Sequence, residues 1–123
     1  MINSHPHFAV IGAGIAGLSC ATVLQQAGLK VSLFDKSHGP AGRMNTRRGD
    51  GWQCDHGAQY FAARDPDFRA EVARLEEAGV AGLWKPRLKV FSGPSSQDRD
   101  STLERFVGVP GMTAPAGWPI PWR

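Results

Sequence analysis

Three glycines in the spacing G-x-G-x-x-G, at Gly12, Gly14 and Gly17, constrain the fold of this chain more than any other feature. They follow an apolar run, residues 8–11, that has the composition of a buried central parallel strand. They also open a segment with helical spacing of apolar residues, which Gly28 ends. Gly12 permits a tight turn, Gly14 lets a pyrophosphate approach the backbone, and Gly17 lets the helix pack closely on the strand. The pattern predicts a strand, turn and helix that present backbone N–H groups to a dinucleotide.

A carboxylate follows this segment at the position where a dinucleotide site needs one. The second apolar stretch, residues 31–34, ends at Asp35, roughly 20 residues after Gly12, as expected for an acid that binds ribose hydroxyls. Its negative charge disfavours a 2′-phosphate at the same place. The alternative, a glycine turn that closes a βα unit without a ligand, leaves Asp35 unexplained. We therefore predict an α/β fold with a Rossmann-like βαβ unit.

Composition limits the kinds of partner that we expect for the chain. Its 123 residues carry 14 Lys and Arg against 11 Asp and Glu, a net charge of +3, in scattered positions without basic runs. This distribution predicts no nucleic-acid partner. Two cysteines, Cys20 and Cys54, are too few for a disulfide framework or a zinc site, so no metal is expected. No apolar run approaches ~18 residues and no signal-peptide pattern begins the chain, which predicts a cytoplasmic protein without a membrane partner.

The segment after Asp35 contains a candidate phosphate contact. Residues 36–45 are rich in glycine and proline and predict a loop. Arg43 follows the flexible Gly42, from where its planar guanidinium could reach two phosphate oxygens. The alternative is a solvated loop arginine. Residues 44–48 and 52–55 predict a hairpin. His56, in the turn that follows, is interpreted as structural or exposed rather than as a catalytic base.

The remainder of the chain predicts a mixture of helix and strand. Asp65 and Pro66 begin a helix that Gly79 ends. A strand is expected over residues 87–91, a polar loop or hairpin tip over 92–101 and a returning strand over 103–109. Four of the nine prolines lie in residues 110–123, which excludes a regular helix there.

Four motifs together resemble a known family. GAGIAGLSCA, GPAGRMNTRR, DHGAQYFAARDPDF and FVGVPGM are similar to FAD-dependent oxidoreductases of the amine-oxidase superfamily, most closely to its bacterial renalase-like branch. The resemblance runs from about Val10 to Thr113. It implies that FAD is the cofactor and that eight residues bind it: Gly12, Gly14, Ala16 and Gly17 at the pyrophosphate, Asp35 at the ribose, Arg43 from its loop, and Gln59 and Tyr60 near the flavin.

The resemblance also implies two segments: an FAD-binding βαβ unit with its arginine loop (1–61) and the beginning of a mixed α+β substrate domain (62–113). The chain departs from the family near Thr113, and its prolines predict an irregular tail over residues 114–123. The resemblance implies hydride transfer to flavin N5, with oxygen as final acceptor, from a small-molecule substrate, either a dihydronicotinamide dinucleotide or an amine. No residue receives a catalytic assignment.

Two alternatives to this function stay open. Members of the family are much longer, so we expect a truncated chain, and one alternative is a catalytically silent dinucleotide-binding fragment. The other is an NAD-dependent dehydrogenase, which the flavin-side pattern GPAGRM disfavours.

Overall fold

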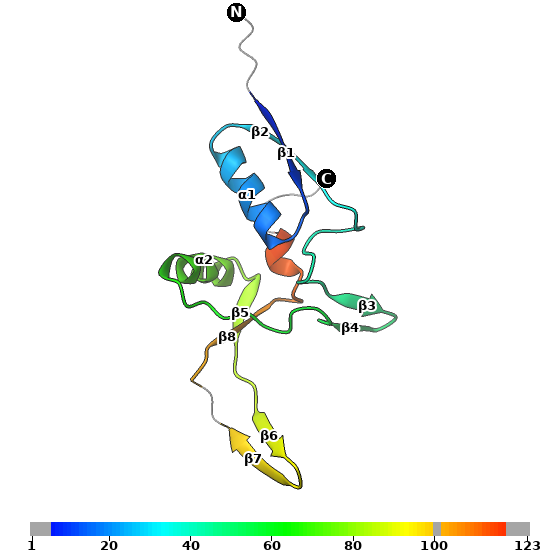
Figure 1. Ribbon diagram of the computed structural model, residues 1–123, viewed down its shortest axis with the longest axis vertical. Helices are drawn as coiled ribbons and strands as arrows, with labels where there is room; N and C mark the ends of the chain where they lie inside the picture. Colours follow the sequence, from blue (N-terminus) through cyan, green and yellow to red (C-terminus); the bar gives the residue numbers. More distant parts are fainter. Residues whose placement is uncertain (1–5, 100–101, 118–123) are drawn as a thin grey trace, which may run out of the picture.

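The computed structural model describes residues 6–99 and 102–117. Its elements form an elongated arrangement, with a βαβ unit near one end and a hairpin at the other (Figure 1). In chain order they are β1 (His7–Ile11), α1 (Ile15–Gln26), β2 (Lys30–Phe34), β3 (Arg47–Gly49), β4 (Trp52–Cys54), α2 (Pro66–Glu77), β5 (Ala81–Trp84), β6 (Leu88–Ser92), β7 (Ser95–Arg99), β8 (Arg105–Gly108) and the 3₁₀ turn η1 (Ala114–Gly117). Within these ranges, no helix is long and apolar enough to cross a membrane.

The βαβ unit forms as the glycine spacing predicts. β1 and β2 pair in parallel, with Phe8 opposite Val31 and Ile11 opposite Phe34. α1 begins directly after the glycine turn and packs against this sheet through buried Leu18. The fold class predicted from the sequence, Rossmann-like α/β, is therefore confirmed.

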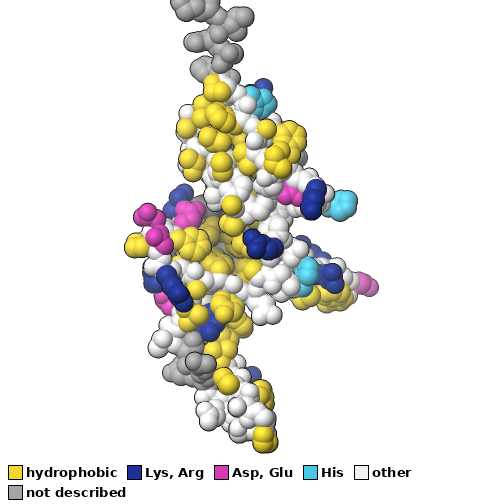
Figure 2. Space-filling view, in the orientation of Figure 1, with side chains coloured by type: hydrophobic (Ala, Val, Ile, Leu, Met, Phe, Trp, Pro, Cys, Tyr) yellow, Lys and Arg dark blue, Asp and Glu magenta, His cyan; other side chains and the backbone are white. Residues whose placement is uncertain are grey.

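The predicted burial of the first strand is wrong. The side chain of Ile11 is 80% exposed and that of Phe34, opposite it on β2, is 55% exposed. The reason is that β1 and β2 form a sheet of only two strands in the described part of the chain. Hydrophobic side chains consequently gather on the surface over this unit (Figure 2).

The second helix begins as its cap residues predict. The side chain of Asp65 accepts hydrogen bonds from the backbone N–H groups of Asp67 at 2.9 Å and Phe68 at 3.1 Å. Val72 of α2 packs with Ala63 and Phe106 in a buried cluster. These contacts fix α2 against the antiparallel pair β5–β8.

Two strands differ from the sequence prediction. β5 (Ala81–Trp84) was not predicted, because its four residues show no alternation and its partner β8 lies more than twenty residues further along the chain. Residues 92–101 were expected to form a polar loop or hairpin tip, and within them residues 95–99 form the strand β7, which pairs with β6 as a hairpin. A tight turn at Gly93, with φ +61°, brings these polar residues into register. The predicted hairpin near residues 44–55 is present as β3–β4.

The proline-rich tail stays a prediction as a segment, and the structure describes only its residues 114–117. They form η1, in which Pro115 and Ala116 are buried. Ala116 packs with Leu18 of α1 and Ala41. This packing explains the order, because a buried apolar turn is stabilised without a regular helix. Residues 118–123 of the predicted tail lie outside the described residues.

A carboxylate holds this last segment against the β3–β4 hairpin. Asp55 Oδ1 accepts hydrogen bonds from Thr46 Oγ1 at 2.5 Å and from the Met112 backbone N–H at 2.9 Å. Gln53 Nε2 donates to the Pro110 carbonyl at 2.8 Å. The motifs DHGAQYF and FVGVPGM, far apart in sequence, are thus joined in space.

Candidate dinucleotide site

The glycine turn has the geometry that its sequence predicts. Gly12 adopts φ +101°, a conformation that favours glycine, and its N–H donates to the Phe34 carbonyl at 2.7 Å. A Cβ at Gly17 would lie 1.8 Å from the Gly12 carbonyl oxygen. Gly17 therefore allows α1 to approach the turn more closely than any other residue type would.

The N-terminus of α1 has the features of an anion-binding site. Gly14 is the N-cap residue, no side chain caps the helix, and the first turn carries no acidic residue. The first-turn N–H groups, including that of Ala16, have no partner within the helix and lie at its positive end. A Cβ at Gly14 would meet nothing within 4 Å. The backbone thus leaves open space where a pyrophosphate could approach these groups.

Asp35 directly follows β2 and is hydrogen-bonded to the glycine turn. Its Oδ2 accepts a hydrogen bond from the Ala13 backbone N–H at 2.6 Å. Its Oδ1 accepts from the Ser37 backbone N–H at 2.7 Å and from the Ser37 hydroxyl. The Ser37 hydroxyl and these two amides lower the pKa of the Asp35 carboxyl from 3.8 to about 2. Asp35 is exposed and ionised at neutral pH, and an ionised carboxylate accepts hydrogen bonds from hydroxyl groups such as those of a ribose.

The arginine loop docks directly on the glycine turn. The Ala41 N–H donates to the Ala13 carbonyl at 2.9 Å, and a Cβ at Gly42 would lie 3.4 Å from the Gly14 Cα. Ala41 is buried and holds φ +95°, which is an uncommon backbone conformation for a residue other than glycine. Arg43 follows Gly42 and is exposed at the protein surface.

These elements enclose a groove of about 480 Å³ at the carboxyl ends of β1 and β2. Ligands bind at this edge of the sheet in open α/β folds. Its walls are partly apolar and carry one carboxylate; the lining residues are Ile11, Gly12, Phe34, Asp35, Lys36, Ser37 and Gly42. The structure therefore brings together the predicted pyrophosphate turn, the predicted ribose carboxylate and the loop that carries Arg43.

Gln59 and Tyr60 lie apart from this groove. Both are exposed, and Tyr60 contacts Trp84 at the end of β5, with ring centroids 6.3 Å apart. The loop that carries them packs on the arginine loop, because the Ala58 N–H donates to the Arg43 carbonyl at 2.8 Å. Their assignment near the flavin stays a prediction. His56 is exposed in the same loop.

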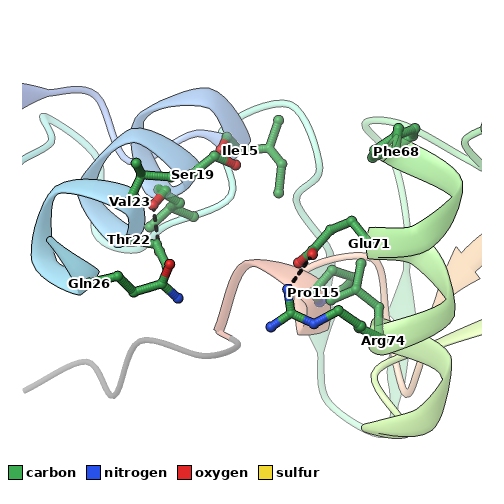
Figure 3. A pocket seen from close by; sticks show the side chains of 11 residues that line it. Ile15, Ser19, Thr22, Val23, Gln26, Phe68, Glu71, Arg74 and Pro115 are labelled. Carbon is green, nitrogen blue, oxygen red and sulfur yellow. Dashed lines mark hydrogen bonds and ion pairs between the residues drawn. The ribbon is translucent and has the colours of Figure 1, made fainter. Parts of the chain in front are cut away.

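A second hollow, of about 300 Å³, lies between α1 and α2 beside Pro115 (Figure 3). Ile15 and Val23 face it from one helix and Phe68 from the other, and the charged groups in its lining, Glu71 and Arg74, pair with each other at 2.9 Å. It is lined by side chains of the two helices, not by the glycine turn. The groove at Asp35 is therefore the better candidate for a dinucleotide.

Two contributors to the site were not predicted from the sequence. Ser37, two residues after Asp35, forms an Asx-type turn with that carboxylate, a local pattern that the sequence does offer. Ala41 joins the loop to the glycine turn, and the sequence carries no signal for an alanine at positive φ.

Comparison with known proteins agrees with this geometry. Residues 10–75 match the model of the NAD(P)-binding Rossmann-like domain family. The chain is similar to hydroxyneurosporene desaturase of Rubrivivax gelatinosus, with 44% identity over 97 residues that cover 68% of this chain and 18% of the desaturase. It is similar to the L-amino-acid oxidase of Siganus canaliculatus, with 37% identity over 70 residues that cover 55% of this chain and 13% of the oxidase.

Among solved structures, putrescine oxidase bound to putrescine superposes with a TM-score of 0.58 and 27% identity, covering 77% of this chain and 21% of the oxidase. Fold and site together define a dinucleotide-binding α/β unit. The chain belongs to the NAD(P)-binding Rossmann-like domain family, within the superfamily of amine oxidases and FAD-dependent oxidoreductases. It spans less than a fifth of the two curated relatives.

Proposed function

We propose that this chain is the cofactor-binding portion of an FAD-dependent oxidoreductase of the renalase-like kind, located in the cytoplasm. One observation carries the proposal: the arginine loop is joined to the glycine turn by the Ala41–Ala13 hydrogen bond, beside the Asp35 carboxylate. A glycine turn with Asp35 alone fits any adenine dinucleotide. The loop GPAGRM, which packs on the glycine turn, is one of the motifs that resemble FAD-dependent oxidoreductases, and it therefore favours FAD.

The residues present fit the adenosine diphosphate part of FAD. Gly12, Gly14, Ala16 and Gly17 would hold the pyrophosphate through backbone N–H groups, since a Cβ at Gly14 would fill the space that the phosphates need. Asp35 would accept hydrogen bonds from the ribose hydroxyls. Gln59 and Tyr60 would border the flavin.

Arg43 would add a positive charge on the solvent side of the phosphates. In the described part of the chain its side chain has no ion pair, so its charge is not neutralised by a neighbouring acid. Bound FAD supplies the hydride acceptor, N5 of its isoalloxazine ring, and its reoxidation by oxygen gives hydrogen peroxide.

The substrate that we propose is a small molecule that donates a hydride, either a dihydronicotinamide dinucleotide or an amine. The amine is supported by similarity to an L-amino-acid oxidase and to putrescine oxidase. The dihydronicotinamide is supported by the renalase-like motifs.

A test loads the chain with FAD, removes oxygen, and adds either reduced nicotinamide dinucleotide or putrescine. The expected result is loss of the flavin absorbance with one of these donors, followed by hydrogen peroxide formation when air is readmitted. The matched control is Gly14→Ala, which is expected to retain no flavin and therefore to show neither signal. Flavin that binds but is bleached by neither donor would contradict the proposed activity.

That contrary outcome defines the second candidate, a catalytically silent dinucleotide-binding fragment. The exposure of Ile11 and Phe34 favours it, because an apolar sheet face open to water destabilises a folded unit and promotes association.

A further inference from the structure

The Ser37 hydroxyl lies in the dinucleotide groove, within hydrogen-bond distance of the Asp35 carboxylate. Both residues line the groove and both are exposed. The Ser37 backbone N–H donates to Asp35 Oδ1 at 2.7 Å, and the Ser37 hydroxyl donates to the same oxygen. This hydroxyl is also the largest cause of the lowered pKa of Asp35, which agrees with its orientation. The two side chains therefore form one polar unit, which we call the Asp35–Ser37 pair.

Donors from the chain itself already occupy most of the Asp35 carboxylate. An ionised carboxylate accepts about four hydrogen bonds, two on each oxygen. Among the described residues, both Ser37 donors bind Oδ1, and the Ala13 N–H binds Oδ2 at 2.6 Å. One acceptor position, on Oδ2, is left for a ligand. A ribose presents two neighbouring hydroxyl groups, so Asp35 by itself accepts a hydrogen bond from only one of them.

The Ser37 oxygen is a second acceptor in the same place. A hydroxyl group donates one hydrogen and keeps two acceptor positions. Ser37 Oγ lies 2.8 Å from the Gly39 carbonyl oxygen, so its hydrogen has an acceptor within reach besides Asp35. The charge of the carboxylate favours the bond to Asp35 while the groove holds no ligand. When a ligand hydroxyl donates to Asp35 instead, the Ser37 O–H bond can turn to Gly39, and Oγ then accepts a hydrogen bond from the groove.

The two acceptors match a pair of neighbouring hydroxyl groups. Ser37 Oγ and the Asp35 carboxylate lie within hydrogen-bond distance of each other, as do the two oxygens of the cis-diol of a ribose. Backbone contacts fix both side chains: Ala13 in the glycine turn binds Asp35, and Gly39 in the arginine loop binds Ser37. The pair is thus oriented before a ligand arrives, which reduces the entropy that is lost on binding.

We propose that Ser37 is a specificity-determining residue of the dinucleotide groove, which together with Asp35 binds both hydroxyl groups of a ribose and so selects nucleotides that carry an intact 2′,3′-diol. Asp35 accepts a hydrogen bond from one hydroxyl and Ser37 Oγ from the other, while the Ser37 hydroxyl donates to the Gly39 carbonyl. This inference rests on the dinucleotide site of the proposed function. The resemblance assigns the ribose to Asp35 alone, and the role of Ser37 follows from the contacts of its hydroxyl.

Calorimetric titration with ADP and with 2′,3′-dideoxy-ADP, which lacks both hydroxyl groups, tests the pair. The unaltered chain is expected to bind ADP at least about tenfold more tightly than the dideoxy compound. Ser37→Ala removes one acceptor and is expected to reduce this preference about fivefold. Ser37→Thr keeps the hydroxyl and is expected to keep the preference within about twofold. Ser19→Ala, the same loss of an exposed hydroxyl on α1 outside the groove, is the matched control and is expected to leave the preference unchanged.

The preference is a ratio of two dissociation constants measured on one variant. A structural defect that weakens both nucleotides equally leaves this ratio unchanged, whereas the loss of an acceptor for the diol lowers it. The comparison of the two nucleotides on the unaltered chain needs no variant at all. Equal binding of ADP and dideoxy-ADP by the unaltered chain would overturn the proposal, and so would an undiminished preference in Ser37→Ala.

Retention of FAD after desalting separates this inference from the proposed function. A chain that retains no FAD but shows the Ser37-dependent preference for ADP would reject the flavin function and leave the role of Ser37 standing. A chain that retains FAD but whose preference for ADP does not depend on Ser37 would do the reverse. A chain that binds neither ADP nor FAD would overturn both.

Discussion

Exchange of Gly14 and of Gly17 for alanine separates the binding role of the glycine turn from its packing role. At Gly17 the new methyl group would lie 1.8 Å from the Gly12 carbonyl oxygen, and both groups belong to backbone that cannot swing aside. Helix α1 must then move away from the turn by more than an ångström. Overpacking of this kind costs about 3 kcal/mol, of which better helix propensity offsets about 1 kcal/mol. We expect Gly17→Ala to lower the free energy of unfolding by about 2 kcal/mol.

Gly14→Ala should behave in the opposite way. Gly14 has φ −73° and ψ 175°, an extended conformation open to any residue, and its Cβ would meet no atom within 4 Å. The free energy of unfolding should therefore change by less than about 1 kcal/mol. The methyl group occupies the proposed phosphate space, so the dissociation constant for ADP should rise at least tenfold.

Urea unfolding followed by circular dichroism measures the first quantity in both variants, and calorimetric titration with ADP measures the second. The reasoning is refuted if Gly14→Ala binds ADP as tightly as the unaltered chain. It is also refuted if Gly17→Ala is as stable as that chain.

Three further predictions concern carboxylates. The pKa of Asp35 is lowered in the folded state, so its stabilising contribution is present above about pH 4 and is lost as pH falls from 3.8 towards about 2. The difference in free energy of unfolding between the unaltered chain and Asp35→Asn, measured by urea unfolding, should therefore shrink over that pH range. A difference that stays constant with pH would contradict this prediction. Asp55→Ala removes the acceptor for the Thr46 hydroxyl and the Met112 N–H and should destabilise the chain by about 1–3 kcal/mol. Thermal unfolding measures this loss, and an unchanged midpoint of the thermal transition would contradict a stabilising role of Asp55. Asp65→Ala removes the cap of α2 and should cost about 1 kcal/mol, with Asp65→Asn as the control that keeps a capping oxygen.

Local signals explain which elements could be predicted. The glycine spacing specifies the turn and the start of α1, and Asp65 with Pro66 specifies the start of α2, because each pattern acts within a few residues. β5 escaped prediction because it depends on pairing with β8, a non-local contact that no short pattern encodes. The burial of β1 was predicted wrongly for a related reason. The apolar sequence of a strand indicates that it pairs and packs with other elements, but it does not indicate how many neighbouring strands the chain provides.

The candidate site divides in the same way. Gly12, Gly14 and Asp35 could be predicted because phosphate and ribose recognition requires residue types at known spacing. The hydrogen bond between Ala41 and Ala13 joins two loops, and the contact of Asp55 with Met112 crosses more than fifty residues. Such contacts depend on the whole fold and become visible only in the structure.

The most direct test of the central claim, that the glycine turn, Asp35 and the arginine loop hold FAD, is an absorbance spectrum. The purified chain is incubated with FAD, desalted and measured beside Gly14→Ala treated identically. The account predicts flavin bands that stay with the unaltered chain and are lost with the variant. A folded chain that emerges colourless, or a variant that retains the flavin equally, would contradict it.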